Sequence, residues 1–370
     1  MASLLLFLII LAVLVLSHEF GHFLVAKLFG VRVDEFGFGF PPKLFSFKKG
    51  ETEYSLNLLP FGGFVKIFGE DKSEGDREAG RSFLHQSNSV QASIIVAGVL
   101  FNFLLAWALL SIGFMWGLSV PADWSEMGQG VEDPRLLITD VLEGSPADKA
   151  GIKVNDNIIY AVSKDSALQL PKVQEFVNFI NEHSGEELII GFQRDTGKGF
   201  GDTQVLMITP KEGLVPDRAA IGVGLDMIGI LRLPVHKAIY VGAIATYRLT
   251  VNTIYGLYSF ASGFIFDGTS SFESVSGPVG LIGMVGETAS MGFSYLLSLV
   301  ALISINLGVL NIVPFPALDG GRLLFIIIGA IKKKPIRAEI QNYINIFGFA
   351  FLLLLMFMIT WSDLAKVVAK

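Results

Sequence analysis

The sequence predicts a polytopic α-helical membrane protein with about four transmembrane helices, a small β-sheet and one inserted soluble α+β domain. Of its 370 residues, 52% are hydrophobic and only 17% are charged. Soluble globular proteins have about 45–50% apolar and roughly 25% charged residues. The apolar residues gather in long runs, and a polar stretch at residues 128–212 separates two groups of them. The chain therefore combines membrane segments with a soluble domain.

Charge and cysteine content narrow the chemistry. A net charge of −6 gives no reason to expect a nucleic-acid partner. The chain has no cysteine, which excludes disulfides, thiolate metal sites and cysteine nucleophiles. A transition-metal site would have to use histidine, aspartate and glutamate.

The first predicted span occupies residues 1–29, with a helix from Ala2 to about Leu28. Its length is near that which a hydrocarbon core of about 30 Å requires. No lysine or arginine precedes the apolar run, and no small-residue cleavage site follows it, as a cleaved signal peptide would need. We expect a retained transmembrane helix.

Polar residues within this span form a metal-binding pattern. His18 and His22 are four residues apart, so on a helix they share one face and can bind one ion. Zinc lowers the pKa of a bound water to about 7, and Glu19 is placed to act as general base on that water. Such residues are costly in an apolar helix and mark function there. The alternative, a chance match on a solvated helix, fits this context poorly.

A third metal ligand has to come from elsewhere in the chain, because a catalytic zinc usually has three protein ligands and an open position. The histidines at positions 85, 183 and 236 lie in or beside polar segments, which favours the surface. Asp319 follows Pro314 and Pro316, which break the preceding helix and let the carboxylate turn toward the bundle interior. We expect Asp319 to be the ligand; a turn that merely caps a span is the alternative.

Residues 30–70 read as a membrane-associated sheet. Four short strands are predicted between glycine and proline signals, at Val31–Phe38, Leu44–Phe47, Thr52–Leu58 and Phe64–Phe68. They are rich in phenylalanine and leucine, which suggests a sheet that dips toward lipid or packs under helices. Residues 71–89 are polar and are predicted as a surface loop.

Three further spans are predicted at residues 93–120, 294–320 and 343–362. The segment 237–268 is hydrophobic but carries Arg248 and several threonines and asparagines. If it crossed the membrane, Asp319 would face the opposite side from the histidine pair, and the basic cluster 332–337 would lie outside, against the positive-inside rule. We therefore expect 237–268 to be an amphipathic interfacial helix, with the domain 128–212 extracytoplasmic.

The soluble domain resembles a PDZ domain of the permuted bacterial type. The resemblance rests on residues 144–159, GSPADKAGIKVNDNII, which match the turn-helix-turn of that domain. The usual Gly-Asp appears as Asn155-Asp156, and asparagine also tolerates left-handed backbone. A PDZ domain can bind an extended peptide by strand addition, and a plain spacer or lid is the alternative.

Taken together, the motifs resemble the site-2 protease family of intramembrane zinc metalloproteases (peptidase family M50), and within it the bacterial RseP type. The likeness covers nearly the whole chain and rests on HEFGH at residues 18–22, GFGF at 37–40, SGPVG at 276–280 and NIVPFPALDGG at 311–321. It implies zinc held by His18, His22 and Asp319, with Glu19 as base. It also implies a membrane-reentrant β-sheet, and substrate contacts at Asn311, Asn306, Gly37 and Gly39. RseP-type members often carry two tandem PDZ domains, whereas one is visible here.

The predicted function is therefore hydrolysis of peptide bonds within the transmembrane segments of single-span proteins, such as anti-sigma factors or remnant signal peptides. The resemblance places the enzyme in a bacterial cytoplasmic (inner) membrane, with its active site near the cytoplasmic side. A substrate helix must unwind, and an exposed edge of the predicted sheet would satisfy its backbone by strand addition. Two alternatives remain: a membrane protein that transports or senses a metal, and a PDZ scaffold with an inactive site.

Overall fold

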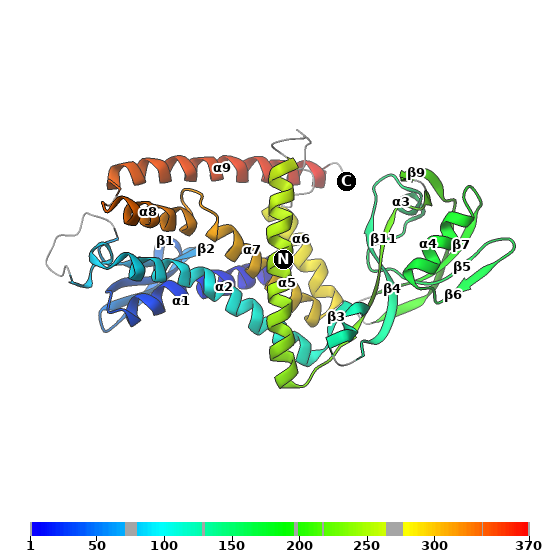
Figure 1. The fold of residues 1–370 in the computed structure, drawn as a ribbon, viewed down its shortest axis with the longest axis horizontal. Helices are drawn as coiled ribbons and strands as arrows, with labels where there is room; N and C mark the ends of the chain where they lie inside the picture. Colours follow the sequence, from blue (N-terminus) through cyan, green and yellow to red (C-terminus); the bar gives the residue numbers. More distant parts are fainter. Residues whose placement is uncertain are drawn as a thin grey trace. The chain divides into compact units, whose positions relative to one another are not determined.

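The computed structural model describes residues 2–70, 80–127, 130–195, 199–216, 218–263, 277–334 and 336–368. The chain forms two compact units (Figure 1). The first comprises Met1–Ser111, Gly242–Thr288 and Leu297–Lys370, and the second comprises Ile112–Val241 and Ala289–Leu296.

Four helices within the described residues have the length and apolar composition that crossing a bilayer requires. They are α1 (Ala2–Leu28), α2 (Asn88–Trp116), α7 (Phe293–Ile312) and the Glu339–Leu364 part of α9 (Ala338–Val368). Their number agrees with the prediction. Helix α5 (Val235–Ser262) is not among them, and its interfacial position stays a prediction.

Both predicted boundaries of the second span, 93–120, differ from the structure. Helix α2 begins five residues before position 93, where the Ser87 hydroxyl accepts a hydrogen bond from the backbone N–H of Val90 at 3.4 Å. It ends at Trp116, because the next residue, Gly117, has a φ of 105° and leaves the helical region. Residues 118–121 form strand β3 rather than helix.

The predicted third span, 294–320, is two helices. Helix α7 ends at Ile312, and α8 (Asp319–Lys332) starts only after a loop that contains Pro314 and Pro316. Ala317 has a left-handed backbone (φ 73°), which completes the turn. The break expected from the prolines thus occurs, and it places Asp319 in the first turn of a new helix.

Strands β1 (Val33–Lys49) and β2 (Thr52–Ile67) bend, so that they pair as four antiparallel segments. The pairing gives the spatial order 43–49, 52–57, 33–38 and 63–67. The bends fall at glycines with positive φ, Gly39 at 83° and Gly62 at 103°. The four predicted strands therefore correspond to these segments, and residues 63–67 form one edge segment of the sheet within the part of the chain that the structure describes.

Two shorter elements also contribute residues to the first unit. Helix α6 (Pro278–Met291) begins within the predicted 276–280 motif, of which residue 276 lies outside the described residues. Its Gly280 N–H donates to the Asp363 carboxylate at 3.0 Å. The 3₁₀ helix η2 (Phe83–His85) occupies part of the predicted loop 71–89, of which residues 71–79 are not described.

The second unit contains a mixed α/β fold around a seven-stranded sheet. Its strand order is β3-β11-β4-β5-β7-β8, with β6 paired to β5. The strands are β3 (Leu118–Pro121), β4 (Glu132–Val141), β5 (Asn157–Val162), β6 (Ala167–Gln169), β7 (Leu188–Asp195), β8 (Phe200–Ile208) and β11 (Val223–Leu231). The helices are η3 (Ala122–Met127), α3 (Pro146–Ala150) and α4 (Val173–Glu182), and β9 (Lys211–Val215) pairs with β10 (Arg218–Ala220).

The predicted turn-helix-turn has the expected local geometry. Ser145 caps α3 by accepting the Asp148 N–H, and Gly151 ends it with a φ of 86°. Asn155 has a φ of 69°, the left-handed geometry that asparagine was expected to tolerate. Assignment of the domain to the PDZ class remains a prediction.

The sheet continues beyond residue 212, the predicted end of this domain, to Leu231. Strand β11 lies between β3 and β4, inside the sheet. Gly224 and Gly229 interrupt the alternating hydrophobic pattern of β11, so the sequence does not predict a strand there. Both are tightly packed: a Cβ at Gly224 would lie 2.8 Å from Thr139 Oγ1, and one at Gly229 2.7 Å from the Glu132 carbonyl oxygen.

Helices α1 and α2 pack closely beside the metal-binding pattern. A Cβ at Gly21 would lie 2.4 Å from the backbone oxygen of Ala97. Only glycine permits this approach, because backbone atoms cannot move aside as a flexible side chain can.

We predict that Gly21→Ala lowers the midpoint of thermal unfolding of the purified chain in detergent. The added methyl forces the two helices apart, and overpacking of this kind costs about 1–3 kcal/mol. Gly256→Ala in α5 is the matched control, since its Cβ would meet no atom within 4 Å. Equal midpoints for both variants would contradict the close packing.

Candidate metal centre

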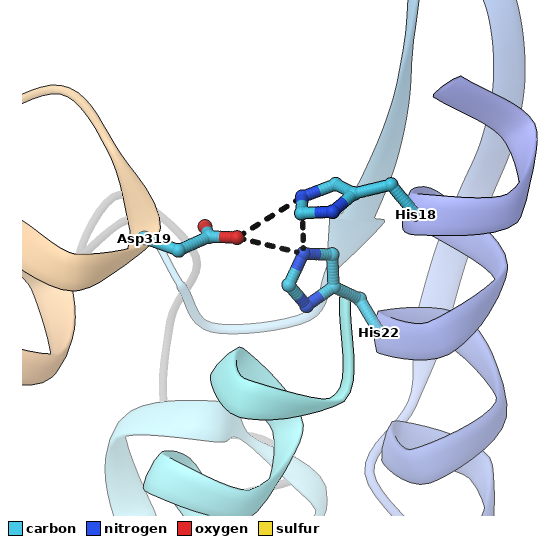
Figure 2. A group of neighbouring side chains, drawn as sticks. All are labelled: His18, His22 and Asp319. Carbon is cyan, nitrogen blue, oxygen red and sulfur yellow. Dashed lines mark hydrogen bonds and ion pairs between the residues drawn. The ribbon is translucent and has the colours of Figure 1, made fainter. Parts of the chain in front are cut away.

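His18 and His22 project from one face of α1 toward the start of α8 (Figure 2). Their ring centroids are 4.8 Å apart and the rings are nearly perpendicular. The two Nε2 atoms are 3.2 Å apart. The predicted sharing of a helix face therefore brings two ring nitrogens to one point.

Helix α2 orients the ring of His22. Its Nδ1 lies 2.8 Å from the backbone oxygen of Ile94. A carbonyl oxygen only accepts, so Nδ1 carries the ring proton and Nε2 of the neutral ring presents a lone pair. This is the arrangement by which an outer hydrogen bond prepares a histidine to bind a metal.

Asp319 completes the group from α8. Its Oδ2 lies 3.0 Å from Nε2 of His18 and 3.2 Å from Nε2 of His22 (Figure 2). The two glycines that follow allow this position: a Cβ at Gly320 would lie 2.2 Å from the Val313 carbonyl oxygen, and one at Gly321 2.4 Å from that of Phe315. The start of α8 can therefore fold tightly against the loop that ends α7.

The three ligand atoms fit a zinc ion in number, type and spacing. Two imidazole nitrogens and one carboxylate oxygen all lie within 4.8 Å of one another. Tetrahedral zinc bonds of about 2.0–2.1 Å would set neighbouring ligand atoms about 3.3 Å apart. The separations of 3.0 to 3.2 Å match that value closely. Three ligands also leave a fourth position open, as a catalytic site requires.

A cavity of about 400 Å³ surrounds this group. Glu19 and Asn311 line it together with the three ligand residues. Apolar residues form much of the wall, among them Leu14, Val15, Phe83, Ile94, Ile95 and Leu307. The edge segment 63–67 of the β-sheet also lines it, at Gly63, Phe64, Val65 and Ile67. A base candidate, an amide and an extended backbone edge thus share one cavity with the ligands.

The other predicted substrate contacts lie elsewhere. Asn306 accepts a hydrogen bond from Thr253 Oγ1 at 3.0 Å and is not among the residues that line the cavity. Gly37 is inside the sheet, where a Cβ would lie 2.5 Å from the Phe64 ring, and at Gly39 it would lie 2.7 Å from the Leu59 carbonyl oxygen. Close packing alone explains why both positions are glycine. Roles of Gly37, Gly39 and Asn311 in substrate binding remain predictions.

The remaining histidines stay outside the centre, as expected. His85 and His236 are exposed. His183 ends α4, where its ring contacts the Phe179 carbonyl oxygen and the Ser166 hydroxyl.

The sequence reading missed two residues of α2 that touch the histidines. A Cβ at Gly98 would lie 2.3 Å from His22 Nε2 and 2.9 Å from His18 Cε1, so glycine leaves room for both rings. Asn102 Nδ2 lies 3.2 Å from His18 Nδ1. An asparagine in an apolar span is itself a functional signal, which would have identified Asn102. Arg322 and Glu70, an ion pair at 2.6 Å on the cavity wall, were also missed.

We predict that Gly98→Ala weakens zinc binding about 10- to 100-fold, the range seen when support of a ligand is lost. The methyl would displace both imidazole rings from their common point. Zinc affinity of the purified chain, measured by competition with a chromophoric chelator, checks this. Gly283→Ala in α6, where a Cβ meets open space, should leave the affinity unchanged. Normal affinity in Gly98→Ala would show that the rings do not need this space.

Comparisons with known proteins find peptidases and zinc metalloproteases. A model of peptidase family M50 matches residues 6–355. The chain is similar to zinc metalloprotease RasP of Oceanobacillus iheyensis, with 29% identity over 99% of both chains. It is 31% identical to a putative zinc metalloprotease of Clostridium acetobutylicum, over 95% of this chain and 94% of that one. It is 28% identical to the regulator of sigma-W protease RasP of Bacillus subtilis, over 97% of each.

Proposed function

Because the chain belongs to peptidase family M50 and is a zinc metalloendopeptidase, we propose that it cuts peptide bonds within transmembrane segments of single-span membrane proteins. The convergence of His18, His22 and Asp319 in a cavity shared with Glu19 carries this proposal. The histidine pair lies on a helix long and apolar enough to cross a membrane. Such a placement suits substrates that are themselves embedded in lipid.

In the proposed mechanism, His18, His22 and Asp319 would hold the zinc. When bound, the ion would act as a Lewis acid and lower the pKa of water toward neutrality. Glu19 takes a proton from the attacking water and gives it to the nitrogen of the leaving amine. Its place on α1, next to His18, keeps the carboxylate beside the reacting bond throughout.

The cavity wall supports these proton transfers. The side chains of Leu14, Ile94 and Ile95 are nearly fully buried and present apolar surface to the site. Water is thereby restricted, and electrostatic interactions are stronger than in bulk solvent. On this account the Asn311 amide donates a hydrogen bond to the substrate backbone, since it is a polar group on the α7 side of the same cavity.

The edge segment 63–67 is the proposed substrate-binding strand. A helix in lipid has its carbonyls already hydrogen-bonded, so the scissile stretch must unwind, and its backbone groups then need new partners. Among the described residues, strand pairing of this segment is to residues 33–38 alone, and Gly63, Phe64, Val65 and Ile67 line the cavity. A substrate strand added there would be held extended beside Glu19, whose Cγ would lie 3.4 Å from a Cβ at Gly63.

The sheet is proposed to enter the membrane with its Phe40 and Leu59 end leading, because the opposite end, the β1–β2 turn, is charged and its Glu51 pairs with Lys27 in the last turn of α1 at 2.6 Å. Phe40, Leu58 and Leu59 are 49%, 51% and 45% exposed at the leading end. Exposed apolar residues clustered in this way fit lipid better than water. The basic cluster 332–337 then belongs on the cytoplasmic side by the positive-inside rule, which also puts the active site near that face.

The substrate class and location follow from this placement. The relative in Bacillus subtilis is named a regulator of sigma-W, which favours regulatory membrane proteins such as anti-sigma factors. Remnant signal peptides have the same single-span form. We propose a bacterial cytoplasmic membrane as the location.

The second unit is proposed to act as a PDZ-type peptide-binding domain outside the cytoplasm. A cavity of about 230 Å³ lies between α4 and β11, with Phe176, Val177, Ile180 and Leu225 in its wall. Strand β3 covers β11 only at residues 228–231, so the first half of β11 has an edge on which a peptide strand can add.

We predict that Glu19→Gln abolishes cleavage of a single-span model substrate while zinc content stays at the wild-type level. The amide cannot accept the proton of the attacking water, but it leaves the three ligands in place. Glu187→Gln, at an exposed position in the second unit, is the control and should cleave normally.

Cleavage and zinc content are measured on the same detergent preparation. Undiminished cleavage by Glu19→Gln would exclude Glu19 as the base. A wild-type chain that binds zinc yet cleaves no helical substrate would favour a metal-transporting protein or an inactive scaffold instead.

A second prediction concerns the edge segment 63–67, in which Phe64→Pro and Val65→Pro are made as separate variants. At least one of the two should cleave the substrate less than the wild type does, with normal zinc content. Successive N–H groups point to opposite sides of a strand, so one of the two prolines removes a donor on the side away from residues 33–38. Lys48→Pro is the matched control, because it lies on the opposite edge segment and is not part of the cavity wall. Cleavage that falls no further in the site-edge variants than in the control would exclude strand addition at residues 63–67.

A further inference from the structure

We propose that Asn102 is the positioning residue of His18 and that its amide oxygen accepts the hydrogen bond of the Nδ1–H when the metal is held. This inference rests on the zinc site of the proposed function. Asn102 is fully buried in α2. Its amide lies 3.2 Å from His18 Nδ1, and its Oδ1 has no hydrogen-bond partner among the described residues.

The chemistry of imidazole decides which amide atom faces the ring. For Nε2 of His18 to bind a metal with its lone pair, the single proton of the neutral ring must sit on Nδ1. An N–H needs an acceptor, and only Oδ1 of the amide can accept. A half-turn of the amide about its last side-chain bond exchanges Oδ1 and Nδ2, which have nearly the same size and position. The same side chain can therefore serve the other ring tautomer, in which Nε2–H donates to Asp319 and Nδ1 accepts.

The surrounding contacts hold Asn102 in place for this role. Its backbone oxygen accepts a hydrogen bond from the Ser304 hydroxyl at 2.8 Å, and Ser304 is fully buried in α7. The position of α2 at this residue is thus set independently of the amide. The Asn102 side-chain amide is therefore left to contact His18.

Asn102 also completes a regular arrangement along α2. Ile94, Gly98 and Asn102 are spaced four residues apart and lie along one face of the helix. The Ile94 carbonyl orients His22, Gly98 leaves room for both rings, and Asn102 orients His18. One face of α2 therefore supports both imidazoles, with a backbone acceptor for one and a side-chain acceptor for the other.

The test compares Asn102→Leu, Asn102→Asp and Ser111→Ala in the purified full chain. Leucine has a similar volume but no acceptor, so zinc affinity should fall about 10- to 100-fold. Aspartate accepts but cannot donate, so its affinity should equal or exceed that of the wild type. Ser111→Ala removes a buried hydroxyl of the same helix that, within the described part of the chain, bonds only to the Trp107 carbonyl oxygen, and it should bind zinc normally. The visible absorption spectrum of the cobalt-loaded protein should change in Asn102→Leu alone, because the orientation of a ligand ring is altered.

Unchanged affinity in Asn102→Leu would overturn the proposal, as would equal losses in the leucine and aspartate variants, which would indicate packing alone. If Asn102→Leu cannot be obtained folded, Asn102→Asp decides: wild-type affinity with an unchanged cobalt spectrum supports an acceptor, and weakened binding refutes it. A wild-type chain without a zinc site would instead refute the proposed function, so the two failures are distinguishable.

Discussion

The structure depends on bringing two imidazoles and a carboxylate to one point inside apolar surroundings. Each of these groups is costly to bury without a hydrogen-bonding or ionic partner. The two imidazoles lie on successive turns of α1, and the carboxylate lies in the first turn of α8. The separations of 3.0 to 3.2 Å among His18, His22 and Asp319 show that the helices deliver them to a common centre. A divalent cation there satisfies all three at once.

Glycine makes this convergence sterically feasible. Gly21 and Gly98 let α2 approach α1 closely, and Gly320 and Gly321 let α8 fold back against the loop after α7. None of the four has a left-handed backbone. Their value lies in the missing Cβ, so even alanine at these positions would meet backbone or ligand atoms. The site therefore depends on these four glycines as well as on the three ligand residues.

Parts of this arrangement are readable from sequence because they rest on local rules. The spacing of His18 and His22 indicates a shared helix face, and the prolines before Asp319 indicate a break that redirects the chain. Bends at glycines likewise allowed the four sheet segments to be predicted. The supporting residues were missed because their role exists only across helices: neither Gly98 nor Asn102 reveals from its own neighbours which ring it faces. Strand β11 was missed for a related reason, since Gly224 and Gly229 serve close strand packing and erase the alternating pattern.

The proposed chemistry requires one zinc ion held by two imidazole nitrogens and one carboxylate oxygen. Zinc-edge X-ray absorption of the purified full chain tests it most directly. The account predicts a first shell with two imidazole nitrogens, recognisable by their outer-ring scattering, at about 2.0–2.1 Å, completed by oxygen ligands. A shell of oxygen alone, or one with a single imidazole, would contradict it.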